Sequence, residues 1–191
     1  MLKFSKNLIL ASQSPRRSQL LKQAGFEFTI KTNPIDESFP QDMPLDRVAP
    51  YLAREKALAA KDFLQSPNDI LLTADSVVIL GDRIFNKPEN AAEARRMLRA
   101  LSGQTHEVIT GVCLLSKSAE KVFAGHSKVT IEDLSDTEID YYIETCQPFD
   151  KAGAYAIQEW IGLCKISKIE GTYANIMGLP MDLVYRELMD M

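Results

Sequence analysis

The sequence predicts a domain of the α/β class, because strand-like runs and helix-like periods alternate along it. The run from Ile70 to Leu80 is nearly all apolar, as expected of a buried central strand. From about Leu45 to Phe63, apolar residues recur at helical spacing instead. With 191 residues and no internal repeat or low-complexity tract, the chain has the length of a single domain, residues 1–191.

The first predicted strand and helix lie close together near the N-terminus. The strand is the apolar run Leu8 to Ala11. Ser14 then suits the N-cap of a helix and Pro15 its first position, and Gly25 is a typical stop. Within the long helix that follows, Pro50 is expected to introduce a kink.

The remaining elements are predicted from the same signals. Strands are expected where apolar residues alternate or cluster, at 26–30, 83–85, 106–115, 122–131 and near 166. Helices are expected at 90–101, from 135 and from 180, and residues 33–38 are expected to form a loop. The spacing Ser135-x-x-Glu138 predicts a capping box.

Composition excludes several classes of protein. A net charge of −4 argues against a nucleic-acid-binding protein, so the local basic residues are expected to bind something small. The cysteines 113, 146 and 164 show no CxxC spacing and are expected to be buried free thiols. The N-terminal apolar stretch is too short for a signal peptide, and none approaches the roughly 18 apolar residues of a membrane span. We therefore expect a cytoplasmic protein without a membrane partner.

The predicted helix at Pro15 begins with an unfavourable charge. Arg16 and Arg17 lie in its first turn, where the helix dipole disfavours a cation by about 0.3–1 kcal/mol. Free N–H groups, the hydroxyls of Ser12 and Ser14 and the two guanidinium groups would together suit a phosphate. The alternative is a solvated amphipathic helix whose arginines happen to fall early, and the residues favour phosphate binding only slightly.

Asp75 interrupts the predicted central strand. An unpaired carboxylate buried there would cost several kcal/mol, on the order of the effective desolvation of an ion. We therefore expect Asp75 at the end of the strand, facing a cation or a cleft, where it could hold a divalent metal or orient a water. The alternative is a structural aspartate that binds backbone amides in a turn or bulge.

Four further polar residues stand out, three of them with a structural alternative. Lys56 falls on the apolar stripe of its helix, where most lysines simply reach past the edge of the core. Lys87 precedes Pro88, which holds its backbone extended. Glu37 lies in a predicted loop and would be an ordinary solvated acid unless a metal lies nearby. Gln158 ends a segment of small residues that could approach a flat ligand closely, or could equally form a tight turn into a strand.

The sequence does not support other common catalytic arrangements. His106 and His126 have no ligand spacing and are interpreted as structural or surface residues. The sequence contains neither GxxxxGK[ST] nor GxGxxG, which argues against a P-loop and a standard dinucleotide site. The two serines near the N-terminus lack a GxSxG elbow, which argues against covalent acyl transfer.

Taken together, these residues resemble the Maf family of nucleoside triphosphate pyrophosphatases. The resemblance covers nearly the full length, and its ordered blocks are specific in combination. They are Leu10-Ala11-Ser12-x-Ser14-Pro15-Arg16-Arg17, Asp36-Glu37, Ala53-x-x-Lys56-Ala57, Ala74-Asp75-Ser76-Val77-Val78, Lys87-Pro88, Met97-Leu98-x-x-Leu101-Ser102-Gly103, His106-x-Val108-x-Thr110-Gly111-Val112, Asp150-Lys151-Ala152-Gly153-x-Tyr155-x-Ile157-Gln158 and Asn175-x-x-Gly178-Leu179-Pro180.

The resemblance implies a fold, an activity and a set of site residues. The fold would be an elongated, two-lobed α/β fold with a mixed sheet, flanking helices and a cleft between the lobes, commonly as a homodimer. The activity would be hydrolysis of a nucleoside triphosphate to the monophosphate and pyrophosphate with Mg²⁺ or Mn²⁺. By resemblance, the catalytic residues are Asp75, Lys56 and Lys87, the substrate-binding residues are Ser12, Arg16, Arg17 and Gln158, and the metal ligands are Glu37 and Asp75.

The segment ending at Gln158 looks like the branch of the family that acts on dTTP and UTP, not the branch that prefers 7-methyl-GTP. Two residues depart from the family pattern. Ser76 stands where threonine is common but keeps a hydroxyl, and Glu159 adds an acid where a small residue is usual. The alternatives are a purine or modified-nucleotide pyrophosphatase and a nucleotide-binding regulator of cell division or septation without turnover. The complete set of two acids and four basic residues speaks against a regulator, because a pure binder needs no carboxylate to activate water.

Overall fold

The computed structural model describes residues 4–32 and 38–191. The chain divides into two compact units, which agrees with the two lobes that the resemblance implies. The first unit consists of residues 1–75, 110–125 and 178–191, and the second of residues 76–109 and 126–177.

The described residues form a mixed sheet of seven strands, which confirms the predicted α/β class. The order is β2 (Phe28–Ile30), β1 (Asn7–Leu10), β3 (Asp69–Leu80), β5 (Thr105–Leu115), β6 (Glu120–Ile131) and β7 (Ile166–Glu170), and β4 (Arg83–Phe85) also pairs with β3. Strand β1 is parallel to both β2 and β3, whereas β4 is antiparallel to β3 and β7 is antiparallel to β6.

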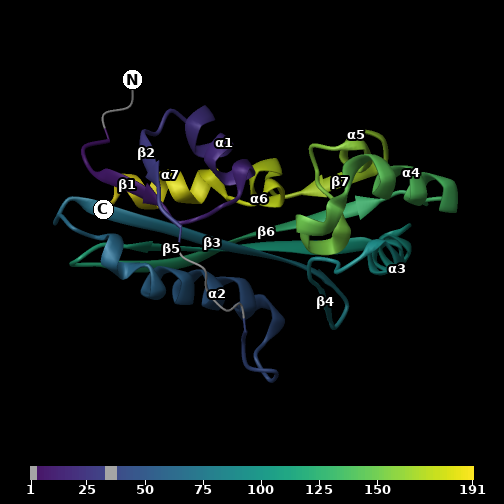
Figure 1. The fold of residues 1–191 in the computed structure, drawn as a ribbon, viewed down its shortest axis with the longest axis horizontal. Coiled ribbons are helices and arrows are strands. Elements are labelled where there is room, and N and C mark those ends of the chain that lie inside the picture. The colour runs from purple at the N-terminus through teal and green to yellow at the C-terminus, as the bar shows by residue number, and fades with distance from the viewer. Residues whose placement is uncertain (1–3, 33–37) are drawn as a thin grey trace. The chain divides into compact units, whose positions relative to one another are not determined.

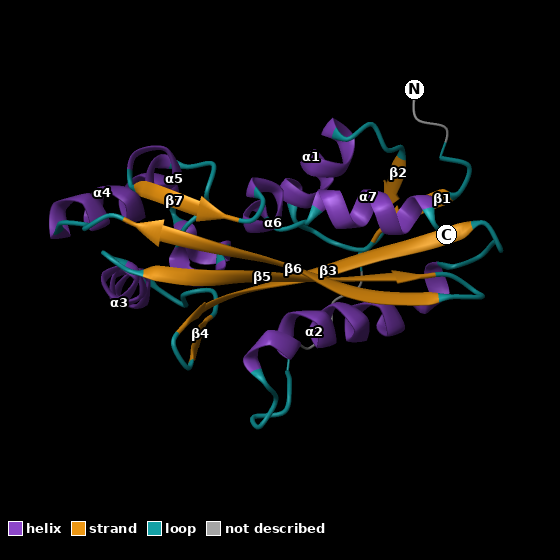
Figure 2. Cartoon of the chain, turned by 180° about the vertical axis from the view of Figure 1, so that it is seen from behind, coloured by secondary structure: helices purple, strands orange, loops and turns teal. Residues whose placement is uncertain are grey.

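In the first unit, helices cover both faces of the strands. Helices α1 (Pro15–Gln23) and α7 (Met181–Met189) lie on one face and α2 (Leu45–Ala59) on the other (Figure 1), and Figure 2 shows the same layers from behind. The apolar run of β3 is mostly buried, as predicted. The long helix is shorter than predicted: α2 ends at Ala59, and the 3₁₀ turn η1 (Lys61–Phe63) follows it.

Helix α2 approaches β5 so closely at Gly111 that no side chain would fit there. A Cβ atom at Gly111 would lie 2.2 Å from both the carbonyl carbon of Ala49 and the nitrogen of Pro50. The helix continues through Pro50, whose ring nitrogen has no hydrogen to donate. Gly111 therefore lets the backbone of α2 pack directly on the sheet.

The second unit contains α3 (Ala91–Leu101), α4 (Asp136–Cys146), α5 (Trp160–Cys164) and α6 (Tyr173–Met177). The capping signals are confirmed: Asn90 accepts a hydrogen bond from the N–H of Glu93, and Ser135 and Glu138 form both halves of the predicted capping box. Within residues 4–32 and 38–191, no helix has the length and apolar character needed to cross a membrane.

The cysteines only partly follow the expectation of buried thiols. Cys113 is buried in β5, and burial raises its pKa to about 12. Cys146 is half-buried and Cys164 is exposed, so the expectation was wrong for these two. Both lie near the ends of helices, where a small side chain need not face the core.

His106 is a buried structural histidine, as predicted, and His126 is exposed. The Nε2 atom of His106 lies 2.7 Å from the hydroxyl of Tyr155, and the two rings meet edge to face. Burial lowers the pKa of His106 to about 4. The imidazole is therefore neutral at pH 7, and protonating it opposes folding.

This burial predicts a pH dependence of stability. Between pH about 6.5 and 4, the unfolded chain binds a proton at His106 and the native protein does not. The free energy of unfolding is therefore greatest above this range and decreases as the pH is lowered through it. From pH 7 to pH 5 we expect a loss of about 2 kcal/mol in the free energy of unfolding. Urea denaturation at several pH values should show a much flatter profile for His106→Gln than for the wild type. Equal slopes in the wild type and His106→Gln would contradict the assignment.

Candidate active site

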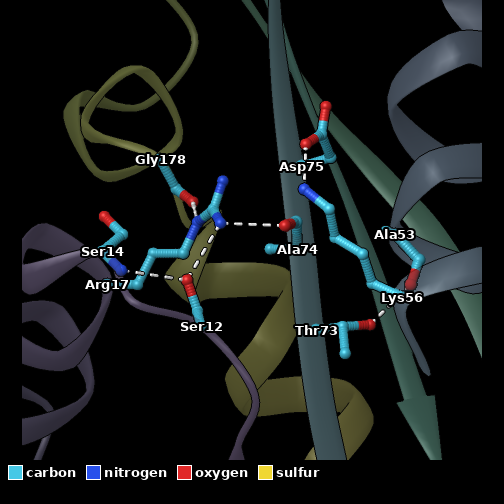
Figure 3. Close-up of polar contacts among 9 residues, drawn as sticks. All are labelled: Ser12, Ser14, Arg17, Ala53, Lys56, Thr73, Ala74, Asp75 and Gly178. Atoms are coloured by element: carbon cyan, nitrogen blue, oxygen red, sulfur yellow. Dashed lines mark hydrogen bonds and ion pairs between the residues drawn. The ribbon is translucent and has the colours of Figure 1, made fainter. Parts of the chain in front are cut away.

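Arg17 joins the start of α1 to two distant segments of the first unit (Figure 3). Its Nε atom donates to the carbonyl oxygen of Gly178 at 2.9 Å. Its Nη1 atom donates to the carbonyl oxygen of Ala74 at 2.8 Å and to the hydroxyl of Ser12 at 3.1 Å. Carbonyl dipoles of the protein therefore offset part of the unfavourable charge at the helix start, for which the sequence predicted a bound anion.

The two serines of the motif have different roles. Ser14 occupies the N-cap position as predicted, but its hydroxyl makes no capping hydrogen bond. Its backbone N–H donates instead to the hydroxyl of Ser12 at 3.2 Å. The oxygen of Ser12 thus accepts hydrogen bonds from Ser14 and Arg17, and its hydroxyl hydrogen is the group that it can offer to a ligand.

Asp75 forms an ion pair with Lys56. The Nζ atom of Lys56 lies 2.6 Å from Oδ1 of Asp75, and the two side chains are only 15% and 12% exposed. Asp75 faces a cation, as predicted, but its expected place at the end of the strand was wrong, because it lies in the middle of β3. The lysine supplies the charge that permits a carboxylate within the strand.

Small residues and one hydroxyl bring Lys56 within reach of β3. Ala53 and Ala57 are fully buried on the side of α2 that packs against the core. The hydroxyl of Thr73 donates to the carbonyl oxygen of Ala53 at 2.6 Å. Because alternate residues of a strand share a face, this bond anchors α2 beside the strand face that carries Asp75. Thr73 was not among the predicted site residues, and its one signal in the sequence is that it is a polar residue within an apolar run.

The middle of β3 is held from both sides. Figure 3 shows Arg17 reaching the carbonyl of Ala74 from the side of α1, and Lys56 reaching Asp75 from the side of α2. Ser12, Arg17, Lys56 and Asp75 therefore come together in the first unit, and Arg16 is half-buried in the same turn of α1 as Arg17. The cation of Lys56 beside the Asp75 carboxylate can attract an anionic substrate, and the carboxylate can activate a water next to it.

The other predicted site residues lie in the second unit or outside the residues that the structure describes. Lys87 is exposed and Gln158 half-buried, and both belong to the second unit. Glu37 lies outside the described residues. In the part of the chain that the structure describes, no three His, Cys, Asp or Glu side chains are grouped so that they could hold a metal ion.

Gln158 carries an unusual polar atom. Its amide oxygen is buried and accepts no hydrogen bond from the residues that the structure describes. A buried acceptor without a donor costs about 1–3 kcal/mol. A ligand, a water or an ion can supply the missing hydrogen bond.

Comparison with known proteins identifies close relatives. Residues 7–191 match the family model described as Maf-like protein. The chain is 46% identical to a dTTP/UTP pyrophosphatase of Phocaeicola vulgatus, over 95% of this chain and 94% of the relative. It is 48% identical to a dTTP/UTP pyrophosphatase of Porphyromonas gingivalis, over 96% of this chain and 93% of the relative. Among solved structures it is similar to the Staphylococcus aureus Ham1 protein, with a TM-score of 0.49 and 15% identity over 67% of this chain and 73% of that one.

The contacts of Arg17 predict a structural role in addition to any role in binding. Arg17→Ala removes the donors to the carbonyl oxygens of Ala74 and Gly178, so we expect the free energy of unfolding to fall by about 1–3 kcal/mol. Arg47→Ala, which removes a largely exposed arginine from α2, should change it by less than about 0.5 kcal/mol. Urea denaturation checks both values, and equal losses in the two variants would contradict the anchoring role.

Proposed function

Because the chain belongs to the Maf-like protein family, we propose that it is a nucleoside triphosphate pyrophosphatase that hydrolyses dTTP and UTP to the monophosphate and pyrophosphate. The ion pair of Lys56 and Asp75 carries the proposal. It combines a carboxylate that can activate water with a cation that can bind phosphate. The names of the two relatives support dTTP and UTP as substrates.

In the proposed reaction, Asp75 orients a water molecule and accepts its proton. The water oxygen attacks the α-phosphorus, the bond from that phosphorus to the bridging oxygen breaks, and pyrophosphate leaves. Lys56, already beside the carboxylate, lies where it can also attract the charge of the reacting phosphate. Preorganised cations are the main means by which proteins accelerate phosphoryl transfer.

The triphosphate is held by groups from the motif at the start of α1 and by a further lysine. Arg16, Arg17 and the hydroxyl of Ser12 bind phosphate oxygens at the helix start. Lys87 contributes a further positive charge. These assignments rest on the residue types and on the family resemblance, and substitution of each residue tests them separately.

A divalent metal, Mg²⁺ or Mn²⁺, belongs to the proposal. Carboxylate oxygens are the ligands that these hard cations prefer, so the side chain of Asp75 fits, and Glu37 would provide a second carboxylate. When bound, the metal would neutralise charge on the triphosphate. The protein's own contribution is to hold the carboxylate of Asp75 in place through Lys56.

Gln158 is proposed to recognise the base. Thymine and uracil present an N–H between two carbonyl groups, and the buried amide oxygen of Gln158 can accept a hydrogen bond from that N–H. Cytosine has no hydrogen on this ring nitrogen, so it should be a poorer substrate. A site built to bind a polar group rejects an analogue that leaves the group unpaired.

A product analysis tests the proposed function. The protein is assayed with dTTP, UTP, CTP, dGTP and 7-methyl-GTP, each with and without Mg²⁺ or Mn²⁺, and the products are separated by chromatography. We expect monophosphate and pyrophosphate, metal-dependent turnover, and the highest kcat/KM for dTTP and UTP. Diphosphate and orthophosphate would contradict the cleavage site, and tight binding without turnover would indicate a regulator. Light scattering on the same preparation tests the homodimer that the resemblance implies.

Asp75→Asn should reduce kcat by about 10²–10⁴-fold, because the amide keeps the shape but cannot accept the proton. Asp69→Asn is the matched control in the same strand. Asp69 is also buried, but its carboxylate accepts hydrogen bonds from the backbone N–H groups of Gln65 and Ser66. This control should lower stability and leave the kcat of the folded protein near the wild-type value. Full activity in folded Asp75→Asn would show that Asp75 has a structural role and does not activate water.

A further inference from the structure

A largely buried polar cluster flanks Gln158 in the second unit. We define the Tyr142 cluster as Tyr142 of α4, Lys151, and Glu159 at the N-cap of α5. The hydroxyl of Tyr142 donates to one carboxylate oxygen of Glu159. The Nζ atom of Lys151 lies 3.3 Å from the other oxygen and 2.7 Å from Oδ1 of Asp150. Both oxygens of Glu159 thus have partners within the protein.

The same hydroxyl also holds the backbone that leads to Gln158. The N–H of Ala156 donates to the hydroxyl of Tyr142 at 3.0 Å. Tyr142 is fully buried, and its burial together with the neighbouring carboxylate of Glu159 raises its pKa well above the usual value for a phenol. The hydroxyl therefore remains protonated and can donate to Glu159 while it accepts from Ala156.

Helix α5 packs against the segment from Ala156 to Glu159 from a second direction. A Cβ atom at Gly162 would lie 1.7 Å from the carbonyl oxygen of Ile157, so the helix backbone packs directly on this residue. Ala156, Ile157 and Glu159 are each fixed by a different contact. Gln158 lies among them, and its buried amide oxygen accepts no hydrogen bond from the described residues.

We propose that the Tyr142 cluster positions Gln158 for recognition of the pyrimidine base, an inference that rests on the proposed function. A single amide can discriminate between bases only if its orientation is fixed before the base binds. The cluster supplies this constraint through a buried hydroxyl, a buried ammonium group and the half-buried carboxylate that joins them. Glu159, the acid where a small residue is usual in the family, is a positioning residue and not a ligand of the base.

The test compares two neighbouring tyrosines of α4. Tyr142→Phe removes only the hydroxyl, and we expect kcat/KM for UTP and dTTP to fall about tenfold, with most of the preference for UTP over CTP lost. Amide hydrogen exchange at Ala156 should become faster, because this N–H loses its acceptor. Tyr141→Phe alters a residue that is 50% exposed and should change none of these quantities. An unchanged preference for UTP over CTP in Tyr142→Phe would overturn the proposal, as would an equal loss of kcat/KM for all nucleotides.

A double variant separates positioning from a general structural effect. If the cluster acts through Gln158, then Tyr142→Phe added to Gln158→Ala causes no further fall in kcat/KM. A further fall of the same size as in the single variant would overturn the proposal. An unchanged kcat/KM in Gln158→Ala alone would overturn both base recognition by Gln158 and its positioning. Pyrophosphate release by the wild type, measured separately, tests the activity itself.

Substitution of Glu159 gives a second measurement, which also applies if Tyr142→Phe fails to fold. In Glu159→Gln the amide oxygen can still accept from Tyr142, whereas Glu159→Ala removes the acceptor. We expect Glu159→Gln to retain more of the preference for UTP over CTP than Glu159→Ala. Equal preferences in these two variants and in the wild type would overturn the proposal.

Discussion

The desolvation of one carboxylate is the constraint on which the candidate site depends. Asp75 lies within a buried strand, where an uncompensated negative charge would cost several kcal/mol. Lys56 offsets this cost from α2, and it can do so only because the helix packs close to the sheet. Gly111, which lacks a side chain, and Thr73, which binds the carbonyl of Ala53, both keep α2 at that distance. The close packing of α2 on the sheet is therefore also what permits a carboxylate at Asp75.

A charge is also stabilised by neighbouring groups of the protein on the other side of the strand. Arg17 lies where the helix dipole disfavours it, and carbonyl oxygens of Ala74 and Gly178 stabilise its charge. These contacts orient the guanidinium before any anion arrives. A preoriented charge needs little reorganisation during a reaction, which is why such groups stabilise transition states effectively. In the second unit, the Tyr142 cluster applies the same principle to a neutral amide.

Elements with strong local signals could be predicted from sequence. The capping box of Ser135 and Glu138 joins residues three apart, and the apolar run of β3 needs no distant partner to be identified. The C-terminal end of α2 was predicted less well, because a helical period continues into η1 although the hydrogen-bond pattern changes. The exposure of Cys164 was also missed, because a cysteine's burial depends on what packs against its helix.

The sequence by itself determined the fold class, the order of most elements and, through ordered motifs, the family and the candidate site residues. Only the tertiary structure decided how those residues are held. Asp75 and Lys56 are 19 residues apart, and Arg17 and Gly178 are 161 apart, so neither contact can be inferred from local periodicity. The sequence does not show whether the carboxylate of Glu159 faces a ligand or Tyr142. Packing between distant segments determines this, because it determines which buried polar atoms have a partner within the protein.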